Sequence, residues 1–201
     1  MAYNNYWLRP DRKNLPIEYL KGEEKSDYLG DVIPGTFSNV ASILEIGCNV
    51  GRNLFHLNAL GFHVEGIEIN PAAVALGETL FEGITYHEGD ACVVLPKLGQ
   101  FDLIFTMAAL QHIPPTGDHL FAYMAEHTSK ILTIEDERHT SGRHYARNYK
   151  DVFERLGFEQ IFSHRPNAPF YHRWLNAERK VKGFGRNFVS RAFEKPVKES
   201  R

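Results

Sequence analysis

Three acidic residues and two glycines recur at a spacing that suits the binding of a nucleoside. Glu45 precedes Gly47 and Gly51, which lie four residues apart after the apolar run SILEI. Glu68 follows Gly47 by 21 residues, and Asp90 follows Glu68 by 22 residues. A glycine turn lets a ligand approach the backbone, and a carboxylate about 20 residues later can accept hydrogen bonds from ribose hydroxyls. The spacing therefore predicts a nucleoside site.

The glycine loop does not fit a dinucleotide. A GxGxxG fingerprint that starts at Gly47 needs glycine at positions 49 and 52, where the chain has Asn49 and Arg52. In that fingerprint, the second glycine lets the backbone approach the pyrophosphate, and the third lets helix and strand pack closely. We therefore expect a nucleoside without a pyrophosphate, bound through Glu68.

Alternating apolar runs and helical patterns bring these residues to one edge of a sheet. The expected strands cover residues 42–46, 63–68, 84–87, 101–106, 130–135 and 158–163, and the expected helices cover 52–60, 71–82, 118–128 and 146–156. Gly61 and Gly157 suit the left-handed position after a helix, and Asn70 with Pro71 suits a helix start. The pattern predicts an α/β fold with a Rossmann-like, doubly wound, mostly parallel sheet and helices on both faces. Ligands of such sheets bind at the carboxyl ends of the strands.

From about Ser42 to Phe162 the sequence resembles the class I S-adenosyl-L-methionine-dependent methyltransferases. In that family an acidic residue precedes a GxGxG loop, a second acid ends the next strand, and a third follows the strand after it. Asn49 replaces the middle glycine, and asparagine tolerates positive φ. The resemblance implies that Glu45, Gly47, Asn49 and Gly51 border the methionine part of the cofactor. The other implied contacts are Glu68 and Ile69 at the ribose, Asp90 and Ala91 at the adenine edge, and Thr106 and Met107 beneath the methionine.

Several of these positions also have a purely structural interpretation. The alternative role of Gly47 and Gly51 is simply to form a tight turn between strand and helix. Glu68, taken alone, could be an ordinary surface acid. Asp90 could only cap a helix, a role that is compatible with ligand contact. Cys48 is expected to pack in the core.

Two histidines are candidates for a general base, because imidazole accepts a proton near neutral pH. The resemblance extends to the segment TMAALQHIPPTGDH and implies that His112 lies near the transferred methyl group. His139 belongs to the loop that follows the strand expected at 130–135. The alternative for His112 is a hydrogen bond to the backbone at a helix start.

Basic side chains gather in that same loop. Guanidinium groups form paired hydrogen bonds with carboxylates and phosphates, so Arg143, His144 and Arg147 are predicted to bind an anionic acceptor. Arg143 and Arg147 lie four residues apart where a helix is expected to begin, and should project from one face. A solvated loop is the alternative. Near the N-terminus, Trp7 and Arg9 are predicted to contact the substrate from a lid, or Trp7 only anchors that segment to the core.

The distribution of charge divides the chain. From His164 onward there are 10 Lys and Arg residues and 3 acidic residues. The preceding 163 residues contain 13 Lys and Arg residues and 22 acidic residues. We expect a lid in residues 1–38, an S-adenosylmethionine-binding core in residues 39–163, and a basic segment in residues 164–201 that completes the sheet. The basic segment could contact a phosphate backbone or only offset the acidic remainder.

Composition narrows the class of protein. A chain of 201 residues with 43% hydrophobic content can bury the core of one domain. It has no run of about 18 apolar residues and no apolar core of a secretion signal, so we expect no membrane span and a cytoplasmic location. Cys48 and Cys92 form no CxxC pair, and the 10 histidines form no HExxH motif, so no metal is expected. The oligomeric state stays open.

These observations predict methyl transfer from S-adenosylmethionine, which leaves as S-adenosylhomocysteine, to a small and anionic acceptor. Oxygen is favoured as the acceptor atom, in a sugar or a natural-product intermediate. One alternative is an RNA or protein methyltransferase that docks its acceptor on the basic segment, and salt-sensitive RNA binding would favour it. The other is a non-catalytic nucleoside-binding module, which would bind the cofactor without turnover.

Overall fold

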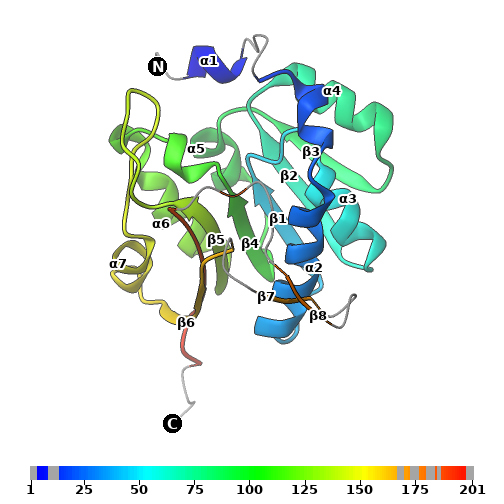
Figure 1. Ribbon diagram of the computed structural model, residues 1–201. Coiled ribbons are helices and arrows are strands. Elements are labelled where there is room, and N and C mark those ends of the chain that lie inside the picture. The colour runs from blue at the N-terminus through cyan, green and yellow to red at the C-terminus, as the bar shows by residue number, and fades with distance from the viewer. Residues whose placement is uncertain are drawn as a thin grey trace.

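A seven-stranded sheet with helices on both faces forms the body of the protein (Figure 1). The computed structural model describes residues 4–8, 14–166, 170–172, 177–179, 184 and 187–197. The strands are β1 (Ser42–Ile46), β2 (His63–Glu68), β3 (Ile84–Glu88), β4 (Leu103–Met107), β5 (Lys130–Asp136), β6 (Glu159–His164) and β9 (Phe188–Glu194), while β7 (Phe170–His172) and β8 (Ala177–Arg179) form a separate pair. The α-helices are α1 (Asn4–Leu8), α2 (Glu23–Thr36), α3 (Arg52–Ala59), α4 (Pro71–Leu80), α5 (Ala91–Val94), α6 (His119–His127) and α7 (Tyr149–Glu154). Short 3₁₀ turns are η1 (Pro16–Leu20), η2 (Leu95–Lys97), η3 (Leu110–His112) and η4 (Pro115–Gly117).

The sheet has the strand order β3-β2-β1-β4-β5-β9-β6. Strands β1 to β5 pair in parallel, whereas β9 pairs antiparallel with both β5 and β6. The chain reverses its direction of travel across the sheet between β1 and β4, because β2 and β3 lie on one side of β1 and β4 and β5 on the other. Such a switch point opens a crevice at the carboxyl ends of the strands. The predicted Rossmann-like fold is confirmed.

Residues of the central strands enter two separate hydrophobic clusters, one on each face of the sheet. Ile43 packs with Leu54 and Leu57 of α3 on one face, whereas Leu44 packs with Phe121 of α6 and Phe153 of α7 on the other. Side chains of a strand point to opposite faces in turn, so a strand that is covered on both sides is apolar throughout. This accounts for the nearly unbroken apolar runs in β1 and β4.

Several local predictions are confirmed. Gly61 and Gly157 follow helices with φ values of 94° and 86°, in the region that only glycine adopts without strain. The side chain of Asn70 accepts a hydrogen bond from the amide of Ala72 over 3.0 Å, and Pro71 begins α4. These residues end one element and begin the next through local chemistry, which is why their positions could be predicted from the sequence.

Other boundaries differ from the predictions. The sequence also favours a single helix over residues 15–32, but Gly22 adopts a φ of 96° and separates η1 from α2. The helix expected at 146–156 is limited to Tyr149–Glu154, capped by Asn148. Asp102 is not part of β4, since its carboxylate accepts hydrogen bonds from the amides of Ala41 and Ser42. The order of the last strands was not anticipated either: β9 lies between β5 and β6.

Within the described part of the chain, no helix is both long enough and apolar enough to cross a membrane.

Candidate active site

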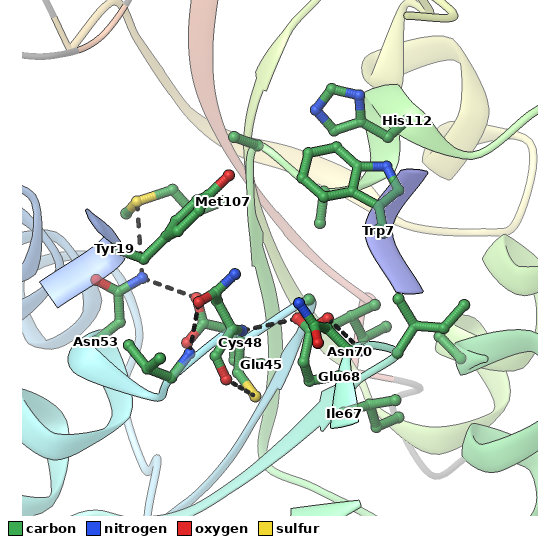
Figure 2. A pocket seen from close by; sticks show the side chains of 18 of the residues that line it. Trp7, Tyr19, Glu45, Cys48, Asn53, Ile67, Glu68, Asn70, Met107 and His112 are labelled. Atoms are coloured by element: carbon green, nitrogen blue, oxygen red, sulfur yellow. Dashed lines mark hydrogen bonds between the residues drawn. The ribbon is translucent and has the colours of Figure 1, made fainter. Parts of the chain in front are cut away.

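A cavity of about 270 Å³ opens where β1, β2 and β4 end. Figure 2 shows Glu45 and Glu68 along one side of it, with Tyr19 and Met107 above Glu45 and with Trp7 and His112 above Glu68. Parallel strands bring their carboxyl ends to one edge, so residues far apart in the sequence meet there. The structure thus gathers most of the residues singled out from the sequence.

The loop after β1 presents its backbone to this cavity. The amides of Gly47 and Cys48 both donate to the carbonyl of Ile67, at 2.8 and 3.2 Å. Asn49 has a φ of 49°, so this asparagine adopts the positive φ anticipated for it. At Gly47, with a φ of 76°, a Cβ atom would lie 2.6 Å from the Cβ of Ala109. The loop therefore requires glycine at position 47.

Gly51 shapes the loop without lining the cavity. Its φ is 81°, and a Cβ atom there would lie 2.2 Å from the hydroxyl of Tyr86. That hydroxyl donates to the carbonyl of Val50 over 2.9 Å. The predicted cofactor contact at Gly51 is therefore corrected: this residue forms the turn, while Gly47 and Asn49 line the site.

Glu45 is a buried carboxylate with one unsatisfied oxygen. It is 1% exposed, and its Oε1 accepts from Nδ2 of Asn53 over 2.8 Å. Its Oε2 accepts no hydrogen bond from the described residues. Burial raises the pKa of Glu45 to about 8, an effect that the Asn53 hydrogen bond and nearby Arg52 partly oppose. A cationic group in the cavity would satisfy the free oxygen.

Glu68 is held rigidly by the two loops on either side of it. Its Oε2 accepts from the amide of Asn49, and its Oε1 accepts from the amide of Asn70, each over 2.8 Å. Burial raises the pKa of Glu68, whereas these backbone hydrogen bonds lower it. Each carboxylate oxygen can accept a further hydrogen bond, so the side chain can bind a ribose diol from the cavity side.

The remaining predicted cofactor contacts divide into two groups. Ile69, Asp90, Ala91 and Met107 line the cavity. Asp90 also caps α5 by accepting from the amide of Cys92 over 2.9 Å, so both interpretations of this residue fit. The predicted cofactor contact at Thr106 is corrected. This residue is fully buried and does not line the cavity, and its hydroxyl donates to Glu135 over 2.8 Å.

His112 lines the cavity at the end of η3. Its Nδ1 lies 2.8 Å from the carbonyl oxygen of Arg143, so this nitrogen carries the proton and donates it. Nε2 is left as the acceptor, with only a 3.4 Å approach by the side-chain amide of Gln111. Burial lowers the pKa of His112 to about 4. His112 is therefore neutral at physiological pH, with a lone pair on Nε2.

The other predicted catalytic and acceptor residues lie behind His112. The ring of His144 lies 4.5 Å from that of His112, and the ring of His139 lies 4.9 Å from that of His144. Neither His139 nor His144 lines the cavity, and His139 is exposed. Direct contact of these two residues with the reacting groups is therefore not supported.

Arg143 and Arg147 do not form a fork toward an acceptor. No helix begins at Arg143, whose guanidinium instead lies 3.9 Å from the ring centre of Tyr6. The guanidinium of Arg147 donates to the carbonyls of Leu110, Tyr145 and Ile113 and pairs with Asp118 over 2.6 Å. Its side chain is only 9% exposed. The acceptor role predicted for Arg147 is thus corrected, because its donors are directed into the protein.

Trp7 of α1 covers the cavity. Its ring lies 4.7 Å from that of His112 and 4.9 Å from that of Tyr6. Because Arg143 stacks on Tyr6, the N-terminal helix rests on the loop after β5. The predicted substrate contact at Arg9 lies outside the described residues.

Three other residues that line the cavity were not predicted from the sequence. Tyr19 and Lys25 reach the cavity from η1 and α2, and Phe188 reaches it from β9. The ammonium of Lys25 lies 5.2 Å from the ring centre of Phe184, and no described carboxylate pairs with it. Burial lowers the pKa of Lys25, with a smaller contribution from Arg52. None of these residues belongs to a motif, and only the tertiary fold brings them together.

The comparisons with known proteins agree with this geometry. Residues 43–130 match the family model described as "Methyltransferase domain". Over 79 residues the chain is 32% identical to norajmaline N-methyltransferase from Rauvolfia serpentina, a match that covers 36% of this chain and 27% of that protein. The chain therefore spans only about a quarter of that relative's length.

Solved structures share the fold across most of the chain. The TehB-like SAM-dependent methyltransferase from Corynebacterium glutamicum is 21% identical with a TM-score of 0.62, over 85% of this chain and 87% of that one. A SAM-dependent methyltransferase from Archaeoglobus fulgidus is 19% identical with a TM-score of 0.66, over 92% and 100%. Phosphoethanolamine N-methyltransferase 2 from Haemonchus contortus, in complex with S-adenosyl-L-methionine, is 15% identical with a TM-score of 0.70, over 98% and 60%. Residues 43–130 thus match a methyltransferase domain, and the chain as a whole shares the fold of solved S-adenosylmethionine-dependent methyltransferases.

Proposed function

We propose that this protein binds S-adenosylmethionine in the cavity at the ends of β1, β2 and β4 and transfers its methyl group to a small molecule. The observation that carries the proposal is the pair of buried carboxylates, Glu45 and Glu68, at the ends of adjacent strands around a glycine loop. Each has acceptor capacity on the cavity side. The two carboxylates match the two polar ends of this cofactor, its amino acid and its ribose.

The residues present fit the cofactor. The unsatisfied Oε2 of Glu45 would accept from the α-ammonium group of the methionine part, and the open backbone at Gly47 would lie against it. Glu68 would accept from the ribose hydroxyls, and Ile69, Asp90 and Ala91 would border the adenine. The ammonium of Lys25 would pair with the methionine carboxylate, because the donors of Arg52, the neighbouring cation of the cavity, are directed at the carbonyls of Tyr19 and Lys21 and at the side chain of Asn53.

The cofactor supplies an electrophilic methyl group on a sulfonium, so the protein has mainly to align an acceptor and exclude water. Trp7, Tyr19, Met107 and Phe188 would form the dry walls around that group. For a hydroxyl acceptor, Nε2 of His112 would take the proton as the oxygen attacks the methyl carbon, and the electrons of the broken carbon–sulfur bond would remain on sulfur. We therefore favour oxygen as the acceptor atom.

The proposal includes an organisation of the chain. Residues 1–38 act as the lid, residues 39–163 as the cofactor-binding core, and residues 164–201 complete the sheet through β9. A small acceptor is favoured over RNA, since Arg191 of the basic segment pairs with Glu137 over 2.7 Å and is thereby unavailable to a phosphate backbone. The donors of Arg147 are engaged within the protein, so this residue does not support an anionic acceptor and we do not propose one.

Two measurements test the proposal. Isothermal calorimetry should detect S-adenosylhomocysteine at micromolar affinity and no comparable binding of NAD. Incubation with methyl-labelled S-adenosylmethionine and a panel of hydroxylated and amino-containing metabolites should then label one acceptor class. Label in total RNA instead would support the RNA alternative. Tight cofactor binding without any labelled acceptor would support the non-catalytic alternative, and no cofactor binding would refute both.

A further inference from the structure

The turn Leu110–His112, which carries the proposed base, is held by charged side chains from both of its sides. It follows β4 directly and touches the glycine loop, because Ala109 packs against Gly47. Its backbone is unusual. Ala108 has a φ of 58°, a conformation that costs a residue with a Cβ atom about 1 kcal/mol or more. Such a conformation persists only where its surroundings impose it.

Glu135, at the end of β5, binds the amide side of the turn. Its Oε1 accepts from the amides of Ala109 and Leu110, each over 3.1 Å, and its Oε2 accepts from the amide of Gln111 over 3.2 Å. The hydroxyl of Thr106 supplies a fourth hydrogen bond. Glu135 is fully buried, and no described cation pairs with it. Three consecutive backbone amides therefore stabilise this carboxylate, a role that a cation would otherwise have.

Arg147 binds the carbonyl side of the same turn. Its guanidinium donates to the carbonyl of Leu110 over 3.3 Å and to that of Ile113 over 2.7 Å, and Asp118 pairs with it. A planar guanidinium offers five donors in fixed directions, so it can satisfy several carbonyls that a lysine could not reach together. The turn is thus fixed on both polar sides of its backbone.

Two further contacts carry this fixation to the imidazole of His112. The side-chain carbonyl of Gln111 accepts from the amide of Asp136 over 2.7 Å, which directs the Gln111 amide nitrogen toward Nε2 of His112. Nδ1 of His112 donates to the carbonyl of Arg143, in the loop that Arg147 also belongs to. The position of the turn therefore determines which nitrogen of His112 carries the proton.

We infer that Glu135 and Arg147 are positioning residues that together fix the ring of His112 at the cavity wall, with its proton on Nδ1 and with Nε2 left as the acceptor. The inference rests on the proposed methyl transfer for its purpose, but the geometry it describes exists without an acceptor. A base that must take a proton in the transition state is effective only when its lone pair is already directed at that proton. Glu135 and Arg147 perform this task from behind, without touching the cofactor.

The experiment measures the tautomer of His112 directly. Long-range proton–nitrogen NMR of ¹⁵N-histidine-labelled protein, bound to S-adenosylhomocysteine, should show wild-type His112 with its proton on Nδ1, assigned by its loss in His112→Gln. Glu135→Gln keeps the size of the side chain but replaces an acceptor oxygen with an NH₂ group that cannot accept from the amides. This variant should give a mixture of both tautomers. With the acceptor found by the labelling panel, kcat should fall ten- to a hundredfold while KM changes less than threefold.

The matched control is Glu137→Gln, the same substitution two residues further on, which removes the ion pair with Arg191. It should lower thermal stability but leave the His112 signals and kcat unchanged. Should Glu135→Gln not fold, Arg147→Gln tests the same point from the carbonyl side, and Arg147→Lys should restore only part of the Nδ1–H population. Unaltered tautomer signals in both Glu135→Gln and Arg147→Gln would overturn the inference. Because the NMR measurement needs no acceptor, a failure of the proposed methyl transfer would be seen separately, as absence of any labelled product.

Discussion

Nδ2 of Asn53 donates to Oε1 of Glu45 over 2.8 Å and thereby fixes a carboxylate at the cavity wall whose other oxygen is buried without a described partner. Asn53 lies in the first turn of α3, and its Oδ1 accepts in turn from Ser26 of α2 and from Arg52. The carboxylate proposed to bind the methionine end is thus held in place by side chains of the protein itself. Pre-organisation of this kind reduces the cost of ordering side chains on binding.

We predict that cofactor binding releases a proton from Glu45. In the free protein the pKa of Glu45 is raised to about 8, so the group is mostly protonated at pH 7. The α-ammonium of S-adenosylhomocysteine would favour the carboxylate and expel the proton. Calorimetry at pH 7 in phosphate and in Tris should give binding enthalpies that differ by the buffers' heats of ionisation, for up to about one proton. In Glu45→Gln, or with 5′-methylthioadenosine as ligand, the enthalpies should agree between buffers.

The same raised pKa predicts how stability of the free protein depends on pH. The folded state binds more protons than the unfolded state between pH 4.5 and about 8, so the stability that protonated Glu45 contributes is lost as pH rises through this window. The melting temperature of wild type should therefore decline from pH 5.5 to pH 8.5. The melting temperature of Glu45→Gln should decline less over the same pH range. Part of the decline should remain, because burial also raises the pKa of Glu135 to about 7. Equal slopes would mean that Glu45 ionises normally.

Loss of the Glu68 carboxylate should weaken cofactor binding strongly. Glu68→Ala removes the acceptors for the ribose hydroxyls and also leaves the amides of Asn49 and Asn70 without their partner. Hydrogen bonds to a charged group contribute about 1.5–3 kcal/mol, so the Kd for S-adenosylhomocysteine should rise roughly ten- to a hundredfold. Calorimetry measures this, and Glu88→Ala at the end of the neighbouring β3 is the control. Equal Kd values for wild type and Glu68→Ala would refute the assignment of the ribose site.

Lys25 should distinguish ligands by their carboxylate. Lys25→Met is expected to raise the Kd of S-adenosylhomocysteine about tenfold, because an ion pair in a partly buried site is lost. It should leave the Kd of 5′-methylthioadenosine, which lacks the amino acid part, within a factor of two. Lys21→Met provides the matched control, since the side chain of Lys21 is 74% exposed. If Lys25→Met weakens both ligands alike, Lys25 supports the lid and binds no carboxylate.

Gly66 should not tolerate even a methyl group. A Cβ atom there would lie 2.5 Å from Sγ of Cys48 and 2.6 Å from Cδ1 of Leu54, between β2 and the glycine loop. Overpacking of a buried site costs about 1–3 kcal/mol, so the free energy of unfolding of Gly66→Ala should fall by that amount. In Gly35→Ala of α2, nothing lies within 4 Å of the new atom, and this variant should be stabilised by about 0.5–1 kcal/mol. Urea denaturation of both variants provides the comparison.

The parts of the site that could be predicted from sequence are those fixed by local spacing. The acids after β1, β2 and β3 recur once per strand, helix and loop, so counting along the chain brings Glu45, Glu68 and Asp90 to one edge. Positive φ at Asn49 and the cap at Asn70 likewise depend on residues within a few positions. For these, the sequence and the fold carry the same information.

The roles of Arg147, Thr106 and Glu135 could not be predicted, because they depend on distant partners. Arg147 looked like an anion-binding residue by composition, yet it binds carbonyls more than 30 residues earlier in the chain. Thr106 adjoins the cavity in sequence but faces Glu135, since alternate residues of a strand point to opposite faces. Charge and spacing do not reveal which polar groups of a protein are already engaged with one another.

The place of β9 in the sheet has a consequence for how the chain folds. Strands β5 and β6 are complete by residue 164, but β9, which pairs with β6 and with the side of β5 away from β4, comes only at residues 188–194. During synthesis, β6 has no hydrogen-bonding neighbour and the edge of β5 stays open until that late segment arrives. Exposed strand edges favour association between chains, and pairing across long separations is slow. We therefore expect a protein truncated after residue 187 to aggregate, even though strands β1 to β4, where we propose that the cofactor binds, are intact.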